Sequence, residues 1–440
     1  MDVLYRCCCG MDVHKDTVAV CVLIWEAGGA RKEKRVFGTT TKQLLELSDW
    51  LHGHEVTHVA MESTGVYWKP IWNILEGQFD ITLVNAQHFK AVPGRKTDLK
   101  DGEWLGDLLQ HGLLRKSFVP EKPIRELRDL TRSRAMLARE KVRLSCRIQK
   151  VLEDANIKLS SVASDVLGSS GRAMLQAIVK GESDPTVLAE MAQKRLRAKI
   201  PQLQIALTGR LTDHHRFLLK QWLELLATVE DKIAVFDQKI EETGAPFVAA
   251  VVTWVTIPGI DRVAAWCLVA EIGTNMDQFG SAERLSSWAG MCPGNNESAG
   301  KKKSGKTRRG SVWLRRVLCE AAWAASHCKR SYFRAQFHRL AGKKGKKRAL
   351  IAVAHSVLVV AYMLLKRGCG YQDLGADYFE QINQNQLTRY HLKNCNGSGT
   401  QLLWLPAPRD AVFSGERNVP LTPSRCGDAG RTTTDDPSRS

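Results

Sequence analysis

The sequence predicts a mixed α/β region at the N-terminus and a longer, mainly helical remainder. Over the first 85 residues, short apolar runs of strand length alternate with helical patterns. Beyond residue 120, leucines recur every seven residues and apolar helical spacing continues into the C-terminal third. The expected divisions are an α/β domain, a helical connector, a helical domain and a disordered tail, at 1–119, 120–245, 246–372 and 373–440.

The first region is expected to run β-β-β-α-β-α-β-α. Strands are expected at 7–13, 17–25, 35–38, 56–61 and 81–84, and helices at 41–52, 66–75 and 97–109. Three strands in succession predict a meander, and the strands and helices that follow predict a mixed sheet covered by helices.

The charge of the chain favours a polyanionic partner. Lys and Arg number 64 against 46 Asp and Glu, a net charge of +18. Nucleic acid is the first partner that this excess predicts and a membrane surface the second. The longest apolar run, 349–365, is short for a membrane span, contains His355 and Ser356, and is expected to be a buried helix. Without a recognisable signal peptide, we expect a cytoplasmic, nucleoid-associated protein with no membrane partner.

Cysteine spacing predicts neither disulfides nor a metal site. The 12 cysteines include no pair of CxxC motifs, and the run Cys7-Cys8-Cys9 enters a strand. Successive strand residues point to opposite faces, so these three thiols cannot easily share one ion. We expect free, reduced thiols.

Four acids form the first candidate site. Asp98 and Asp101 open a helix, where the helix dipole alone would explain them. Asp12 lies on the first expected strand and Glu62 at the end of the fourth, and strand ends are where sites collect in such sheets. Four convergent carboxylates would repel one another without cations, so the set predicts metal binding by two Mg²⁺ ions.

A Gly-rich, basic segment over 291–310 is the second candidate. A hydroxyl in a cationic loop can attack a phosphodiester, because nearby positive charge stabilises the developing anion. A flexible loop that only binds phosphate would have the same composition. In either case the expected nucleic-acid contacts are basic side chains of this loop and of the helix after it: Lys301, Lys302, Lys303, Lys306, Arg308, Arg309, Arg315 and Arg316.

The helical connector and the domain after it each leave one question open. The leucine seam of the connector is interrupted by Arg134 and Lys141, and its many arginines, Arg128 and Arg132 among them, fit a solvated face or a nucleic-acid contact equally well. Further on, 256–261 resembles half of a helix-hairpin-helix motif, but a simple Pro-Gly turn before a helix has the same appearance.

Ordered motifs over residues 8–370 give a specific resemblance. They are 10–15 (GMDVHK), 61–67 (MESTGVY), 94–101 (GRKTDLKD), 290–293 (GMCP), 298–300 (SAG) and 310–316 (GSVWLRR). This series resembles the insertion-sequence one-ten (Piv/MooV-type) family of DEDD transposases. The resemblance implies a RuvC-like domain of ribonuclease-H fold, a coiled-coil connector and a C-terminal transposase domain.

The resemblance also assigns roles. It implies that Asp12, Glu62, Asp98 and Asp101 are catalytic metal ligands, with Asp12 rather than the nearby Asp16 as the first acid. The family's nucleophilic serine is best matched by Ser298, although Ala299 separates it from the glycine that often follows directly. Ser304 is the weaker match.

The function implied is that of a DNA transposase that cuts and rejoins double-stranded DNA through a transient phosphoserine link. A structured bridge RNA would guide it, and it would act as a homodimer or homotetramer. Two alternatives remain: a metal-dependent Holliday-junction-type nuclease with water as the nucleophile, and a non-enzymatic nucleic-acid-binding protein.

Overall fold

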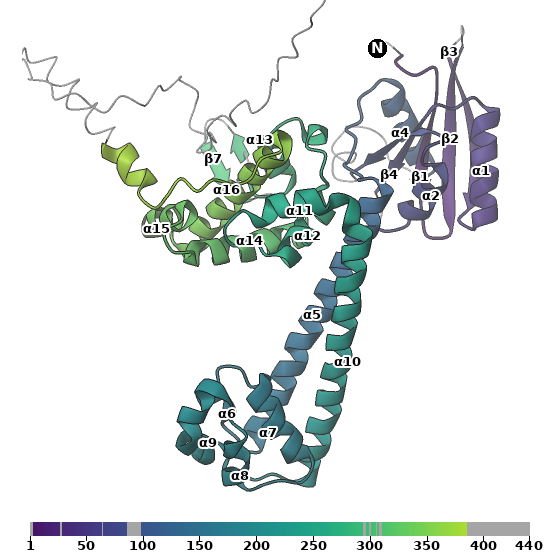
Figure 1. Cartoon of the computed structure of the whole chain (residues 1–440). Helices are drawn as coiled ribbons and strands as arrows, with labels where there is room; N and C mark the ends of the chain where they lie inside the picture. The colour runs from purple at the N-terminus through teal and green to yellow at the C-terminus, as the bar shows by residue number, and fades with distance from the viewer. Residues whose placement is uncertain are drawn as a thin grey trace, which may run out of the picture. The chain divides into compact units, whose positions relative to one another are not determined.

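The computed structural model describes residues 3–26, 29–63, 65–85, 98–293, 296–298, 301–304, 306–307 and 310–384 (Figure 1). The chain forms two compact units, residues 1–119 and residues 120–440. In the first unit the strands are β1 (Cys7–Val13), β2 (Thr17–Glu26), β3 (Gly29–Gly38), β4 (His58–Glu62) and β5 (Asp80–Val84). Its helices are α1 (Thr41–Gly53), α2 (Trp68–Leu75) and α4 (Asp98–Gln110).

The five strands form one mixed sheet in the order β3-β2-β1-β4-β5. The first three strands pair antiparallel, which confirms the predicted meander. β4 then pairs with β1, and β5 with β4, both in parallel. The mixed sheet that the sequence predicts is therefore present, and β1 lies at its centre.

Helices cover both faces of this sheet, and strand β1 is accordingly buried on both sides. Cys9, Met11 and Val13 pack in one core with residues of α1 and α2. Cys8 belongs to a second core on the opposite face, together with Leu109 of α4. Alternate residues of β1 thus face α1 and α2 on one side and α4 on the other.

The same alternation separates the adjacent cysteines. Cys8 and Cys9 lie in different cores, as the strand pattern predicts. Burial raises the pKa of Cys8 to about 12, so its thiol stays protonated at neutral pH. The described cysteines are free thiols, and the run over 7–9 contributes to packing.

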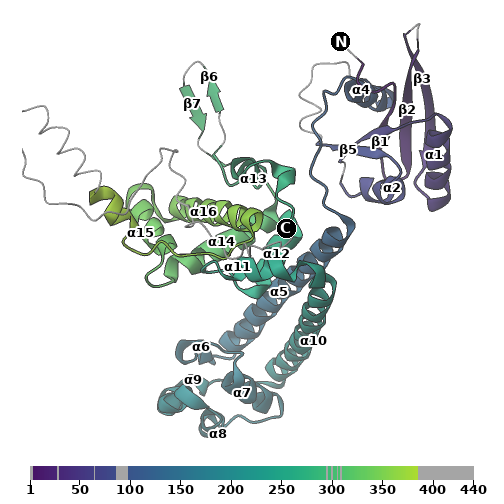
Figure 2. The ribbon, with the colours of Figure 1, turned by 45° about the horizontal axis from the view of Figure 1, so that its top comes forward.

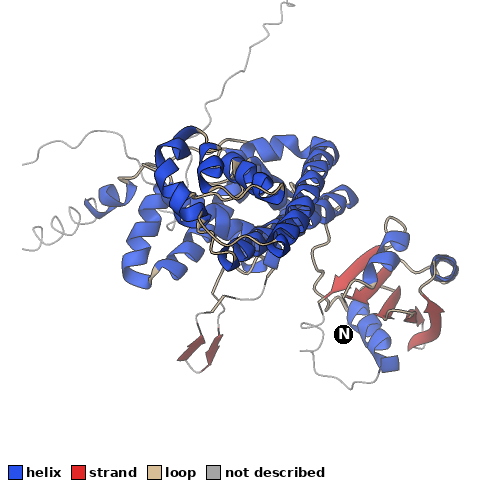
Figure 3. Ribbon diagram, turned by 90° about the horizontal axis from the view of Figure 1, so that it is seen from below, coloured by secondary structure: helices blue, strands red, loops and turns tan. Residues whose placement is uncertain are grey.

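The second unit is helical apart from one short hairpin among its described residues (Figure 3). Its first part comprises α5 (Lys122–Asp154), α6 (Leu159–Val162), α7 (Ser169–Val179), α8 (Pro185–Glu190), η1 (Lys194–Lys199), α9 (Ile200–Leu207) and α10 (Asp213–Gly244). Its second part comprises η2 (Ala245–Phe247), α11 (Val248–Val255), α12 (Arg262–Ile272), η3 (Asp277–Phe279), α13 (Ala282–Trp288), β6 (Asn296–Ser298), β7 (Lys301–Ser304), α14 (Val312–His327), α15 (Tyr332–Lys344) and α16 (Lys346–Arg367).

Helices α5 and α10 pack antiparallel along their length as an arm, with α6 to α9 at its far end (Figure 1). The two basic residues that interrupt the leucine seam meet acids of the opposite helix. Arg134 binds Asp237 at 2.6 Å, and Lys141 binds Glu230 at 2.8 Å. Burial alone would raise the pKa of Glu230, but hydrogen bonds from Arg172 and Lys141 hold it below its usual range. The interruptions therefore act as paired charges between the two helices.

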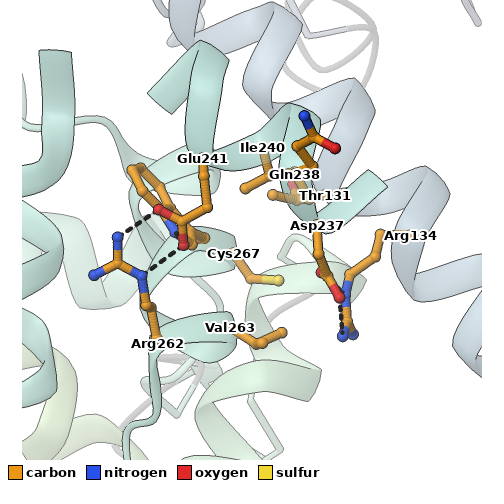
Figure 4. A pocket seen from close by; sticks show the side chains of 10 residues that line it. Thr131, Arg134, Asp237, Gln238, Ile240, Glu241, Arg262, Val263 and Cys267 are labelled. Carbon is orange, nitrogen blue, oxygen red and sulfur yellow. Dashed lines mark hydrogen bonds and ion pairs between the residues drawn. The ribbon is translucent and has the colours of Figure 1, made fainter. Parts of the chain in front are cut away.

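The root of the arm packs against α12. The ion pairs Arg134–Asp237 and Arg262–Glu241 lie on two sides of a small cavity of about 290 Å³, and Figure 4 shows the Cys267 side chain between them. The indole of Trp266 donates a hydrogen bond to Glu241 at 2.8 Å. These contacts fix the end of α10 to the C-terminal helices.

The turn over 256–261 is occupied by packing within the unit. Gly259 has φ of +87°, and a Cβ there would lie 2.4 Å from the carbonyl oxygen of Ala321 in α14. Asp261 caps α12 by accepting a hydrogen bond from the Ala264 amide at 2.7 Å. Close approach to α14 and a positive φ thus account for the glycine at this position.

Helix α16 corresponds to the long apolar run. It is the one described helix with the length and composition of a membrane span, and half of its most apolar window is buried within the structure. It packs against α11, α13, α14 and α15, as expected of a core helix.

The predicted start of the disordered tail, residue 373, is too early, because the structure still describes the residues up to 384. Asp373 accepts a hydrogen bond from the amide of Tyr332 at 2.9 Å, and Phe379 stacks on the ring of Tyr332 at 5.2 Å between centroids. Aromatic residues within a polar, Gly-rich context anchor this segment to α15, a contact that composition alone does not reveal. Residues 385–440 lie outside the described part of the chain.

Candidate active site and nucleic-acid interface

Asp12 and Glu62 lie side by side on adjacent parallel strands. The register pairs Met11 with Met61, so the next residues, Asp12 and Glu62, are at the same level. Met11 and Met61 both belong to the core under α1 and α2. The two acids therefore point to the opposite face, which α4 covers. Each is only 8% exposed.

Helix α4 is held against β1 by glycines. A Cβ on Gly10 would lie 2.0 Å from the carbonyl oxygen of Gly102 and 2.4 Å from the amide nitrogen of Gly106. A Cβ on Gly102 would lie 3.5 Å from the backbone nitrogen of Asp12. The first turns of α4 thus pass directly over the strand that carries Asp12. Asp101, next to Gly102, is half-buried at this crossing.

Gly10→Ala is therefore expected to displace α4. The added methyl meets only backbone atoms, which cannot rotate away, so overpacking should lower the free energy of unfolding by about 3 kcal/mol. Chemical denaturation of the full chain measures this loss. Gly53→Ala is the matched control, because nothing lies within 4 Å of its new methyl. Equal stability of the two variants would contradict the close approach of α4 to β1.

The donors at this crossing suit a divalent cation. Asp12 contacts the His14 ring at 3.1 Å. The Glu62 side chain forms no hydrogen bond or ion pair with another described residue. Buried carboxylates are costly without a compensating charge, and carboxylate oxygens are the ligands that Mg²⁺ prefers. Among the described residues no group of three or more His, Cys, Asp or Glu is close enough to form a complete metal site, and the Asp98 side chain lies outside them.

Ser298, the candidate nucleophile, is the last residue of β6 in the hairpin that projects beyond α13 (Figure 2). It pairs with Lys301, the first residue of β7. The alternative, Ser304, pairs with Asn296 at the other end of the hairpin. The structure describes only the backbone of these residues. The sequence predicts a loop here, and the two strands are a finding of the structure.

The two ends of the hairpin are fixed to the helices beside it. Gly310 approaches the start of the segment so closely that a Cβ would lie 2.3 Å from the carbonyl oxygen of Ala289. An isolated β-bridge joins Pro293 to Thr307. Arg315 of α14 donates a hydrogen bond to the Thr307 hydroxyl at 2.9 Å. The base of the hairpin is therefore anchored through backbone and side-chain contacts.

A buried carboxylate links the end of this segment to the arm. Glu271 is 3% exposed and accepts two hydrogen bonds from Arg132 of α5, at 2.7 and 2.9 Å. Ser311, which follows the hairpin and caps α14, donates to the same carboxylate at 3.0 Å. Arg128 donates to the backbone oxygens of Ala270 and Glu271, and burial lowers its pKa to about 10. Of the two uses left open for the connector's arginines, neither holds for Arg128 and Arg132, which are structural.

The structure describes some of the basic residues that are expected to contact nucleic acid and leaves others outside its described part. Lys301, Lys302 and Lys303 lie in β7, while Arg308 and Arg309 lie outside the described residues. Lys306 is exposed, and Arg315 is half-buried beside it on one cavity. Arg316 is exposed on α14.

Sequence reasoning missed two features of these sites. The first is the close approach of α4 to β1. A sequence signal for it was present in Gly102 and Gly106, four residues apart on a helix, and in Gly10 inside a strand. The second is the set of hydrogen bonds to Glu271. No sequence signal indicates them, because the partners Arg132 and Ser311 are 139 and 40 residues away.

Family comparison agrees with this division of sites. A family model described as a transposase, for the DEDD type of IS110 elements, matches residues 9–157 and so spans all four acids. A second, described as the transposase IS116/IS110/IS902 family, matches residues 255–338 and so spans the hairpin and Glu271. No curated protein sequence matches the chain. The two matches, in this order along one chain, show that the protein belongs to the IS110 family of DEDD transposases.

Proposed function

We propose that this transposase cuts and rejoins double-stranded DNA at the ends and target of an insertion element, using Mg²⁺ and a serine nucleophile. The observation that carries the proposal is the placement of Asp12 and Glu62 at one level and on one face of adjacent parallel strands, beneath the helix that bears Asp98 and Asp101. The strand order supports assignment of the first unit as a RuvC-like domain of ribonuclease-H fold.

In this proposal the four acids, Asp12, Glu62, Asp98 and Asp101, hold two Mg²⁺ ions. Bound there, the metal would polarise the scissile phosphate and stabilise the leaving oxygen. Carboxylates on adjacent strands and on one helix present several oxygens without long, mobile side chains between them and the backbone. The glycine contacts of α4 keep the helical pair of acids in register with the strand pair.

Ser298 supplies the attacking oxygen. Its hydroxyl loses a proton, Oγ bonds to phosphorus, and the bond from phosphorus to a deoxyribose oxygen breaks; that oxygen takes up a proton. Reversal of the step by the free hydroxyl of another DNA end rejoins the strands and releases the serine. The phosphoester link conserves the bond, so no nucleotide hydrolysis is needed.

The proposed assembly contains the element's bridge RNA and two or four copies of the chain. The net charge of +18 supports binding of polyanions, and the family resemblance supports RNA guidance. The antiparallel packing of α5 and α10, with buried apolar residues and paired charges between them, supports a role as a coiled-coil connector.

The test is strand cleavage of a plasmid carrying the element junction, with RNA transcribed from the non-coding flank. Cleavage should require Mg²⁺ and stop on addition of EDTA, because chelation removes the charge that the acids need. Undiminished cleavage in EDTA would contradict the metal site. Metal-dependent cleavage that leaves only protein-free ends would favour the junction nuclease with water as the nucleophile.

A further inference from the structure

A large cavity opens beside the base of the serine hairpin. It measures about 1120 Å³ and is bounded by both ends of the hairpin, by α14 and by the facing sides of α15 and α16. Pro293 and Thr307, at the two ends of the hairpin, line the cavity, and so does Arg315 of α14. The cavity therefore adjoins the base of the hairpin, and Ser298 lies at the turn end of the same hairpin.

The rim of this cavity is cationic. Lys344, Lys347 and Arg348 are exposed around it, and Arg315 is half-buried in its wall. None of these four forms an ion pair with a carboxylate of the described residues, and the described lining of the cavity contains no Asp or Glu. Elsewhere in this unit basic residues such as Arg132 and Arg134 are paired with acids. An anionic ligand with more than one negative group would match this rim.

Farther along α16 the lining becomes neutral. Gln336 donates a hydrogen bond to the hydroxyl of Ser356 at 2.8 Å, while its own carbonyl oxygen is buried and has no partner among the described residues. Ile351 provides apolar surface, and burial lowers the pKa of His355, which leaves its ring uncharged at neutral pH. The polar side chains of Gln336 and Ser356 beside the apolar surface of Ile351 suit the polar edge and flat face of a nucleobase.

The volume of the cavity indicates which form of nucleic acid it can hold. The cavity exceeds the roughly 300–1,000 Å³ of small-molecule sites, so it can take more than a single mononucleotide. A duplex presents phosphates on its outside and keeps its bases stacked within, so it cannot place a base against Gln336. A strand with an unpaired base can do so, because its base is free to turn out of the stack.

We propose that this cavity holds an unpaired nucleotide of the DNA strand being cut, with flanking phosphates on Arg315, Lys347 and Arg348 and the base edge on Gln336. The inference rests on the proposed function, which makes DNA the substrate of the adjoining hairpin. It adds that the enzyme reads the strand in an opened state at the base of the hairpin, whose turn end carries the nucleophile.

The first test measures binding of fluorescent single-stranded DNA to the full chain over a range of salt concentrations. Lys347→Gln with Arg348→Gln should weaken binding about tenfold and reduce the slope of log affinity against log salt by about 1.4, or about 0.7 for each phosphate that is no longer neutralised. Lys343→Gln with Lys346→Gln is the matched control: both lysines are exposed neighbours that do not line the cavity. Equally weakened binding in the two pairs would overturn the proposal.

The second readout reports on the base itself. A duplex with 2-aminopurine in a one-base bulge should change fluorescence when bound, and Gln336→Leu should abolish most of that change while the phosphate-dependent affinity stays. An unchanged signal in Gln336→Leu would overturn the base contact. Tighter binding of the matching RNA through the same residues, or full displacement of DNA by inorganic phosphate, would also overturn it. Because neither assay needs cleavage, a protein that binds as expected but fails to cut would contradict only the proposed function.

Discussion

Asp12→Asn is expected to reduce Mg²⁺-dependent strand cleavage by about 1,000-fold or more and to leave the fold intact. The amide has the size of the carboxylate and can still hydrogen-bond to His14. It lacks the negative charge that holds a metal ion, so about 4 kcal/mol of transition-state stabilisation should be lost. Cleavage rates of the wild type and the variant, at saturating DNA, measure the effect.

Asp16→Asn provides the matched control. Asp16 lies only four residues farther on, exposed in the turn between β1 and β2. Its substitution should leave both cleavage and thermal stability near the wild-type values. Wild-type cleavage by Asp12→Asn, or equally reduced cleavage in the two variants, would show that the acids beneath α4 are not the metal site.

Glu271→Ala is expected to destabilise the second unit by about 3–5 kcal/mol, because removal of one partner leaves Arg132 partly buried without its counter-charge. The variant also removes the acceptor of Ser311, at the end of the segment that bears Ser298. Denaturant unfolding measures the stability loss. Glu320→Ala, an exposed acid on α14, should change stability by no more than about 0.5 kcal/mol.

A double variant distinguishes the ion pair from simple loss of volume. Arg132→Met with Glu271→Leu replaces both charges by apolar side chains of similar size, and such replacements are often close to neutral. The double variant should therefore recover most of the stability that Glu271→Ala loses. Further destabilisation in the double variant would contradict the view that an unpaired Arg132 charge causes the loss in the single variant.

The sequence was sufficient to predict the antiparallel meander and the mixed sheet. Period-two alternation in β1 separates Cys8 from Cys9 and places Asp12 on the face opposite Met11, and the parallel pairing of β4 brings Glu62 to the same level. The alternation within β1 follows from a local pattern, whereas the parallel pairing and register of β4 with β1 are findings of the structure.

Contacts between residues far apart in the chain could not be predicted from the sequence. The arginines of α5 fitted a nucleic-acid surface as well as a solvated one, because nothing near Arg132 in the sequence indicates its partner Glu271. The cavity beside the hairpin is likewise assembled from segments that only the tertiary structure brings together, with Pro293, Arg315 and Gln336 on three of them. Charge, in a chain this basic, does not indicate which cations are paired internally.

The nucleophile is tested most directly by a covalent adduct. The wild-type protein, incubated with junction DNA, guide RNA and Mg²⁺ and then denatured, should migrate in gels as a protein–DNA adduct whose DNA maps to Ser298 by peptide mass spectrometry. Ser304→Ala should retain the adduct, while Ser298→Ala should lose it and Asp12→Asn should form little or none. An undiminished adduct in Ser298→Ala would contradict the proposal that this serine attacks the phosphodiester.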